Sequence, residues 1–287
     1  MLDQTAKFSQ VIVIDDGSQE SDVELIQSCI ADQNTYEVEL ISDRQNMGLS
    51  ARLNQALELV KSDWFLILAA DDQLIPTANE ILSKSLDESV NVVWGNLDLI
   101  DESGNELKVS RPRDTWQGPV ARRYIEPGYP FKDLLRYNNF VPGGMTLIRT
   151  AAVRSAGGWD SNVTTEDLDL WLRIGKTSKF KYVNASVGKY RIVAGSKSRR
   201  DSHKLLDNAK LLSKQAGNDK STDRAIAYLA AMRWAFTIFR TKRIPNTSLA
   251  EMAKIIGIPT WYLRVQLPKA IVVPIFGAVF ALVKRLT

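Results

Sequence analysis

Apolar, β-branched runs alternate with helix-forming segments over the first hundred residues of this 287-residue chain. One such run, at residues 10–14, is typical of a buried strand and is ended abruptly by two aspartates and a glycine. The same pattern predicts further strands at residues 37–41, 64–70 and 90–94, with helices between them at 20–30, 50–60 and 75–86. Strands separated by helices favour an α/β fold, in which a mostly parallel sheet is flanked by helices.

The composition excludes several kinds of chemistry. Cys29 is the single cysteine, so neither an intrachain disulfide framework nor a cysteine-based zinc cluster is possible. His203 is the single histidine, which argues against a histidine-dependent triad and against a centre with several histidine ligands. Any catalysis must therefore depend on carboxylates, a bound metal or backbone groups.

Two adjacent aspartates, Asp71 and Asp72, follow the apolar run at residues 64–70. Neighbouring ionised carboxylates repel each other unless a cation or a shared proton relieves them. Mg2+ and Mn2+ prefer carboxylate oxygens and often join them to phosphates, so the pair is a candidate metal–phosphate site. The alternative is a turn whose aspartates cap the next helix, with Pro76 near its start.

Two further acidic clusters stand at comparable places in the pattern. Asp15 and Asp16 follow the first strand, and parallel strands place such tips at one edge of the sheet. Residues 166–171 open a predicted helix at 165–174, where Thr164 and Asp167 also fit a simple capping box. Each cluster is weak evidence alone, but three in this order favour one shared site.

The pattern of strands and helices breaks down between residues 103 and 141, where glycine, proline and arginine are frequent. Long loops inside compact domains are often functional, so we expect a loop or lid that shapes a substrate site. The polar and aromatic side chains that would do so are Arg122, Arg123, Tyr124, Tyr129, Asn138 and Asn139.

Several short motifs in a fixed order resemble the family 2 glycosyltransferases, which have the GT-A fold and use nucleotide-sugar donors. The resemblance spans residues 2–199. Its motifs are the segments at residues 11–18, 46–54, 69–76, 157–160, 166–173 and 190–191. It implies a GT-A-type α/β fold, in which a mostly parallel sheet is flanked by helices.

The resemblance also implies a role for each matching residue. Asp167 is expected to be the catalytic base and Asp72 the direct ligand of Mn2+ or Mg2+. Donor binding is expected from Asp15, Asp16, Arg52 and Asp71, with Asp16 at the base of the nucleotide. Glu166 and Trp171 are expected on the acceptor side, while Arg191 and Arg199 are candidate contacts of the diphosphate.

These roles imply transfer of a sugar from a nucleoside diphosphate to an acceptor hydroxyl, in cell-surface polysaccharide or glycolipid synthesis. A metal ion stabilises the charge on the departing diphosphate, and a carboxylate takes the proton of the acceptor. One base opposite the leaving group implies a single displacement with inversion. A dinucleotide-dependent oxidoreductase is disfavoured, because no Gly-x-Gly-x-x-Gly follows a strand.

Three departures from the family pattern leave two interpretations: the chain start is artificially late, which we favour, or the protein is a truncated or inactive nucleotide-sugar-binding paralogue. The family normally begins with a strand and a helix, of which the sequence holds only the helix end, at Gln4-Thr5. Ala69 stands where many relatives have the first aspartate of the metal motif. Val193 stands near the place where relatives often have a histidine.

Charge divides the chain into an acidic body and a basic tail. Residues 1–194 hold 20 lysines and arginines against 28 acidic residues, whereas residues 195–287 hold 17 against 5. We therefore expect a glycosyltransferase domain at 1–200 and a helical basic extension at 201–287.

The apolar part of this extension, residues 270–283, is too short for a confident transmembrane helix. Its basic flanks fit a helix at an anionic membrane surface, and a helix packed on the domain fits equally well. The polar start of the chain is unlike a secretory signal, which implies a cytoplasmic protein, peripheral at the inner face of the membrane. The tail contains no recognisable nucleic-acid-binding module.

Overall fold

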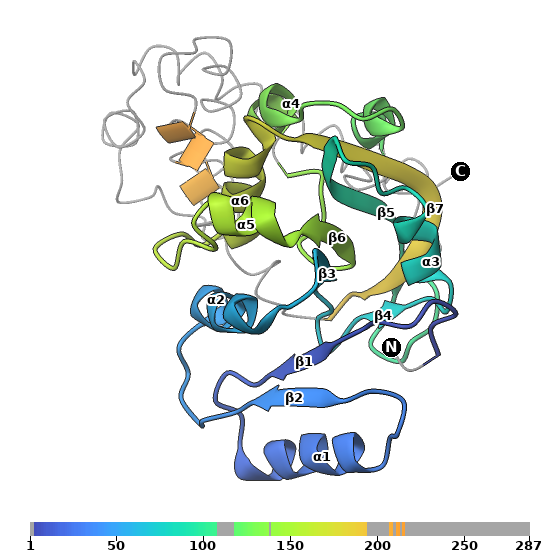
Figure 1. Cartoon of the computed structure of the whole chain (residues 1–287), viewed down its shortest axis with the longest axis vertical. Coiled ribbons are helices and arrows are strands. Elements are labelled where there is room, and N and C mark those ends of the chain that lie inside the picture. The colour runs from blue at the N-terminus through green and yellow to red at the C-terminus, as the bar shows by residue number, and fades with distance from the viewer. Residues whose placement is uncertain are drawn as a thin grey trace, which may run out of the picture. The chain divides into compact units, whose positions relative to one another are not determined.

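Five strands form the larger sheet, in the order β3-β6-β5-β7-β4 (Figure 1). Their bounds are Trp64–Leu66 (β3), Gln73–Leu74 (β4), Val90–Ile100 (β5), Thr146–Arg149 (β6) and Lys179–Arg191 (β7). β5 and β7 run parallel, while β6 pairs antiparallel with β3 and β5, and β4 pairs antiparallel with β7. The pairing is mixed, with fewer parallel pairs than the alternation predicts.

A second, two-stranded sheet is formed near the start of the chain by β1 (Val11–Ile14) and β2 (Val38–Ile41), which run parallel. Helix α1 (Glu20–Ala31) connects them, as the sequence predicts to within one residue. Helix α2 (Leu49–Leu59) contacts β1. No ladder hydrogen bond joins this sheet to the larger one among the described residues.

The computed structural model describes residues 3–107, 118–137, 139–193 and, further on, 207–208, 211–212 and 214–215. The chain divides into two compact units, residues 1–134 with 139–194, and residues 135–138 with 195–287. The predicted boundary near residue 200, Arg199 and the apolar tail at 270–283 lie outside the described residues. In the part that is described, no helix is both long and apolar enough to cross a membrane.

The remaining helices connect successive strands of the larger sheet along the chain. They are α3 (Ala78–Ser83), the 3-10 helix η1 (Ala121–Tyr124), α4 (Phe131–Tyr137), α5 (Thr150–Ser155) and α6 (Glu166–Gly175). In α6 every residue from Leu168 to Leu172 is buried, so this helix lies deep in the fold. Its first turn nevertheless reaches the surface, because Glu166 and Asp167 are only partly buried.

The core lies on both sides of β5. One cluster of buried side chains consists of Ala78, Leu82, Val90, Val93, Leu97, Met145, Leu147 and Val187. A second, aromatic cluster surrounds Trp94, whose ring centroid lies 5.5 to 6.2 Å from those of Tyr182, Tyr124 and Phe140. These contacts fix β5 and β7, and with them the carboxyl ends of both strands.

Three predicted elements differ from the structure in length. The strand predicted at 64–70 stops at Leu66, whose pairing with Leu147 of β6 is the last in the register. The strand predicted at 90–94 continues to Ile100, across register shifts near Asn96. The helix predicted at 75–86 is limited to Ala78–Ser83.

Candidate functional site

Asp15 organises the turn that ends β1. Its side chain is buried, and it accepts hydrogen bonds from the Ser18 amide at 3.1 Å, the Gly17 amide at 3.3 Å and the Ser42 hydroxyl at 3.0 Å. Hydrogen bonding from Ser18, the largest influence, together with that from Ser42 and Gly17, holds the pKa of Asp15 below its usual range. Asp15 is therefore an anionic support of the turn.

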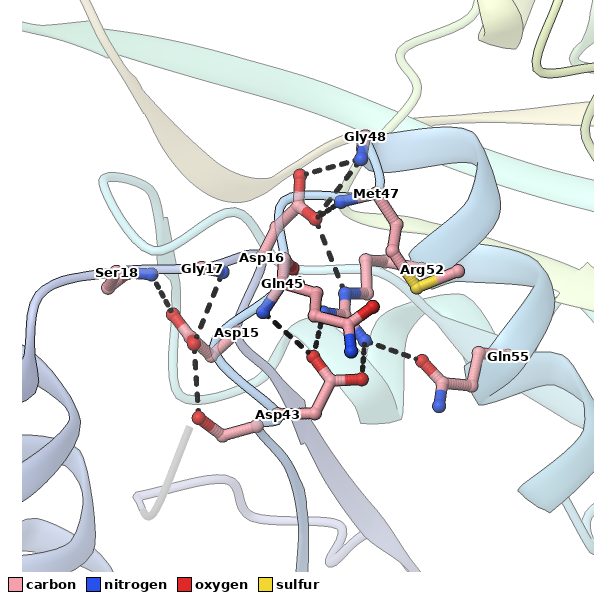
Figure 2. A network of polar contacts seen from close by, with 11 residues as sticks. Asp15, Asp16, Gly17, Ser18, Asp43, Gln45, Met47, Gly48, Arg52 and Gln55 are labelled. Atoms are coloured by element: carbon pink, nitrogen blue, oxygen red, sulfur yellow. Dashed lines mark hydrogen bonds and ion pairs between the residues drawn. The ribbon is translucent and has the colours of Figure 1, made fainter.

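Asp16 is joined to the loop that precedes α2 (Figure 2). Its carboxylate accepts hydrogen bonds from the Met47 amide at 2.7 Å and the Gly48 amide at 3.1 Å. The Nε of Arg52 donates to the same carboxylate at 3.3 Å. The Asp16 side chain is 32% exposed, so part of it faces solvent and can meet a ligand.

Arg52 is buried, with its side chain 1% exposed, and its guanidinium is surrounded by acceptors (Figure 2). Nη1 donates to Asp43 at 3.0 Å and to Gln55 at 2.8 Å, and Nη2 donates to Asp43 and to the Gln45 carbonyl. The Arg52 guanidinium lowers the pKa of Asp43 to about 2. Arg52 thus joins Asp16 to the loop that contains Asp43 and Gln45.

Asp71 and Asp72 lie on a turn between β3 and β4. The Asp72 amide donates to the Ala69 carbonyl at 3.1 Å, and Oδ1 of Asp72 accepts from the Arg191 amide at 2.9 Å. Asp71 is exposed, whereas Asp72 is partly buried. Burial raises the pKa of Asp72 to about 6, and the charge of Asp71 adds to the rise.

The donor atoms of this turn fit a hard divalent cation. Oδ2 of Asp72 accepts no hydrogen bond from any described residue, and the carboxylate of Asp71 is adjacent. No group of three or more acidic, histidine or cysteine side chains suited to a metal occurs in the described part of the chain. Mg2+ and Mn2+ prefer carboxylate oxygens and can be bound by one or two of them together with phosphates and water, so Asp71 and Asp72 are the residues that would hold such an ion.

Asp167 lies in the first turn of α6. Its Oδ1 accepts from the Leu168 amide at 2.7 Å, and its Oδ2 accepts from Nδ2 of Asn139 at 2.7 Å. Glu166 precedes it at the same helix end, and both are partly buried. The N-cap residue is Thr165, one position after the Thr164 that the capping box requires.

A glycine loop, Gly143-Gly144, lies between the Asp167 carboxylate and the segment after β3 that leads to Asp72. A Cβ on Gly143 would lie 3.2 Å from Oδ2 of Asp167, and a Cβ on Gly144 would lie 3.4 Å from the Ile67 carbonyl. The Met145 amide donates to that same Ile67 carbonyl at 2.7 Å. The Gly143-Gly144 loop therefore lies against Asp167 of the third acidic cluster on one side and, on the other, against Ile67 in the segment between β3 and the Asp71-Asp72 turn.

Trp171 is 1% exposed and supports this loop from the core. Its indole Nε1 donates to the Val141 carbonyl at 3.1 Å, and its ring meets Phe180 edge to face at 5.9 Å. The prediction that placed Trp171 at the acceptor surface therefore does not match its burial. A large aromatic residue on α6 packs inward because this helix is covered on nearly all sides.

The sequence reasoning did not identify Asp43 or Gly143 as parts of the site. Asp43 follows the strand predicted at 37–41, and an acidic residue at a strand tip was the signal that could have found it. Gly143 belongs to a Pro-Gly-Gly segment, which marks a close approach of backbone to another group.

Comparison with known proteins identifies the family to which this arrangement belongs. The model of the family described as "Glycosyl transferase family 2" matches residues 1–155, which is more than half of the chain. The chain belongs to glycosyl transferase family 2. This membership confirms the resemblance that the acidic motifs indicate.

Several curated glycosyltransferases are similar in sequence to this family 2 protein. One from Rickettsia conorii is 26% identical over 208 residues, covering 70% of this chain and 32% of the relative. One from Methanocaldococcus jannaschii is 24% identical over 199 residues, covering 67% of this chain and 63% of the relative. The cholesterol galactosyltransferase of Borreliella burgdorferi is 26% identical over 202 residues, covering 64% and 52%. This chain thus spans about a third to two thirds of the length of these relatives.

Solved structures support the GT-A-type fold for this family 2 protein. TarS of Staphylococcus aureus in complex with UDP-GlcNAc superposes with a TM-score of 0.62 at 12% identity, covering 94% of this chain and 83% of TarS. The mannosyltransferase PcManGT of Pyrobaculum calidifontis, in complex with GDP-Man and Mn2+, gives a TM-score of 0.53 at 14% identity, covering 94% and 78%. At these identities the likeness concerns the fold.

Proposed function

We propose that this protein is a metal-dependent, inverting glycosyltransferase that moves a sugar from a nucleoside diphosphate to an acceptor hydroxyl. The observation that carries the proposal is the Gly143-Gly144 loop, which has Asp167 on one side and Ile67, in the segment leading from β3 to Asp72, on the other. Contact of one loop with the candidate base and with the segment that leads to the candidate metal ligand supports this proposal, because transfer from a diphosphate requires the two to be held near each other.

The donor is expected to bind along the turns after β1 and β3. Asp16 has a partly exposed carboxylate that can accept from the N–H of a nucleotide base, while Asp15 and Arg52 hold its turn in place. Asp71 and Asp72 face the ribose and the diphosphate in this proposal. A bound Mn2+ or Mg2+ would stabilise the negative charge that develops on the departing nucleoside diphosphate.

Asp167 is expected to accept the proton of the acceptor hydroxyl. As the acceptor oxygen bonds to the anomeric carbon, the bond from that carbon to the phosphate oxygen breaks and its electron pair leaves with the diphosphate. The Asn139 side chain and the Leu168 amide fix the two oxygens of Asp167 at 2.7 Å each, so the base is oriented in advance. Attack opposite the leaving group inverts the anomeric carbon.

The test is a comparison of Asp167→Asn with the unmodified protein, using a panel of UDP- and GDP-sugars with Mn2+. The variant is expected to bind the donor with unchanged affinity, measured by calorimetry, while release of nucleoside diphosphate falls by about a thousandfold or more. Asp32→Asn is a matched control, because Asp32 is an exposed residue at the end of α1. Its turnover is expected to equal that of the unmodified protein.

Two results would contradict the proposal. Turnover retained by Asp167→Asn would remove Asp167 as the base. Donor binding with no turnover in the unmodified protein, over the whole panel and with glycan and lipid acceptors, would instead favour the inactive nucleotide-sugar-binding paralogue.

We also infer an acceptor that is a cell-surface glycan or a lipid-linked sugar, reached from the cytoplasmic face of the membrane. The charge of residues 195–287, 17 basic against 5 acidic, supports contact with an anionic lipid surface. Flotation with anionic vesicles is the test, and deletion of residues 258–287 is expected to abolish it. Equal flotation of the two proteins would contradict this assignment.

A further inference from the structure

Arg191, the last residue of β7, uses its guanidinium to join two loops that are far apart in sequence. Its Nε donates to the carbonyl of Asp71 at 2.7 Å. Its Nη1 donates to the carbonyls of Asp101 and Glu102 at 2.9 and 3.0 Å. Three of the five N–H groups of a guanidinium are thus used by main-chain carbonyls.

The main chain of Arg191 contacts the same acidic turn. Its amide donates to Oδ1 of Asp72 at 2.9 Å, while its side chain holds the carbonyl of Asp71. One residue therefore fixes the turn through a main-chain atom and a side-chain atom. The other oxygen of Asp72, Oδ2, is left for a ligand.

The second loop that Arg191 holds is a tight hairpin at the end of β5. The carboxylate of Asp101 accepts from the amides of Ser103 and Asn105 at 2.9 Å each, and the Leu107 amide donates to the Leu99 carbonyl at 2.8 Å. Because this hairpin is ordered by its own hydrogen bonds, it is a firm anchor for the guanidinium.

We propose that Arg191 is a positioning residue, which aims Asp72 at the cation site by tying the Asp71-Asp72 turn to the hairpin of residues 101–106. The proposal rests on the metal-dependent function proposed above. It differs from the sequence-based prediction that Arg191 contacts the diphosphate, since three of its N–H groups are already bonded to carbonyls. Metal affinity is then linked to the order of a hairpin that supplies no ligand.

Hydrogen exchange and Mn2+ binding test the proposal in Arg191→Lys, which keeps the charge but cannot reach three carbonyls with one planar group. Exchange in the metal-free variant is expected to accelerate at residues 68–75 and at residues 99–107. The affinity for Mn2+ alone, followed by electron paramagnetic resonance, is expected to fall about tenfold, as losing a residue that orients a ligand typically causes.

Lys189→Gln is the matched control on the same strand. Lys189 pairs with Glu106 at 3.2 Å, so the control removes a contact between β7 and the hairpin without touching the acidic turn. It is expected to keep both the exchange rates at residues 68–75 and the Mn2+ affinity of the unmodified protein.

Unchanged exchange at residues 68–75 in Arg191→Lys would overturn the proposal, as would an unchanged Mn2+ affinity with only the donor KM raised. If Arg191→Lys does not fold, the unmodified protein provides the test. Binding of Mn2+ must then slow hydrogen exchange both at residues 68–75 and at residues 99–107. Slowing at residues 68–75 alone would refute the link. A protein that takes up no Mn2+ would contradict the proposed metal, while the metal-free exchange comparison would still decide the role of Arg191.

Discussion

Asn54 holds both main-chain groups of Trp159. Its Nδ2 donates to the Trp159 carbonyl at 2.8 Å, and its Oδ1 accepts from the Trp159 amide at 2.8 Å. The paired bonds fasten α2, which carries Arg52, to the Gly157-Gly158 turn after α5. Gly158 has a φ of 73°, and a Cβ there would press directly against Asn54.

Asn54→Ala is expected to lower the free energy of unfolding by about 2 kcal/mol, because the amide and carbonyl of the buried Trp159 lose their partner. Chemical denaturation measures the change, and Glu58→Ala, one turn further on the exposed side of α2, is the control. Gly158→Ala places a methyl group where Asn54 makes the same contact. The free energy of unfolding of the double variant, Asn54→Ala with Gly158→Ala, should therefore fall by less than the sum of the two single decreases. Strict additivity would contradict the coupling.

The network around Arg52 should be weakened only at strongly acidic pH. The pKa of Asp43 is lowered to about 2 in the folded protein, below its ordinary 3.8, chiefly by the hydrogen bond from Arg52. Stability from this carboxylate is present above pH 4 and is lost as the pH falls toward 2. Asp43→Asn should therefore be less stable than the unmodified protein at pH 7, with the difference shrinking between pH 4 and 2. Urea unfolding at several pH values measures it, and a constant difference would refute the assignment.

Helices α1 and α2 could be predicted from sequence because their signals are local. Both α1 and α2 begin and end within one residue of the predicted bounds. The strand predicted at 64–70 was too long, because its end depends on a distant partner. Leu66 pairs with Leu147, and beyond this pair the partner chain turns away at Met145, whose φ is 56°.

The partners of individual side chains were harder to predict from the sequence than the positions of the motifs. The motif containing Arg52 was recognised, but no local pattern distinguishes an arginine that meets a ligand from one that binds a neighbouring aspartate. The partners of Arg191 are likewise about 90 to 120 positions away in sequence. Such contacts follow from the order of the strands, which the pattern of apolar residues did not determine.

Asp72 should make the metal-free protein less stable as the pH rises. Its pKa is raised in the folded state, mainly by burial, from an ordinary 3.8 to about 6, so the protonated form is favoured. The stabilising contribution of that form is complete below pH 4 and is lost as the pH rises through 6. At pH 7.5 in the presence of chelator, the free energy of unfolding of Asp72→Asn should exceed that of the unmodified protein by about 1 kcal/mol, after allowance for solvent screening.

Thermal unfolding with chelator and with millimolar Mn2+ measures this effect. Mn2+ should remove the advantage of Asp72→Asn, because the cation binds the ionised carboxylate of the unmodified protein and stabilises it. An unmodified protein that gains no stability from Mn2+ would contradict the assignment of Asp72 as the ligand.

Gly143 should control the orientation of the base. A Cβ at this position would lie 3.1 Å from Cβ and 3.2 Å from Oδ2 of Asp167, so Gly143→Ala must displace the carboxylate by a few tenths of an ångström. We expect kcat to fall about tenfold or more with little change in the KM of the donor, because the displaced group acts on the acceptor. Gly144→Ala is the matched control, since its Cβ would meet the Ile67 carbonyl at an ordinary 3.4 Å. A donor KM that rises in Gly143→Ala while kcat is retained would place this loop on the donor side instead.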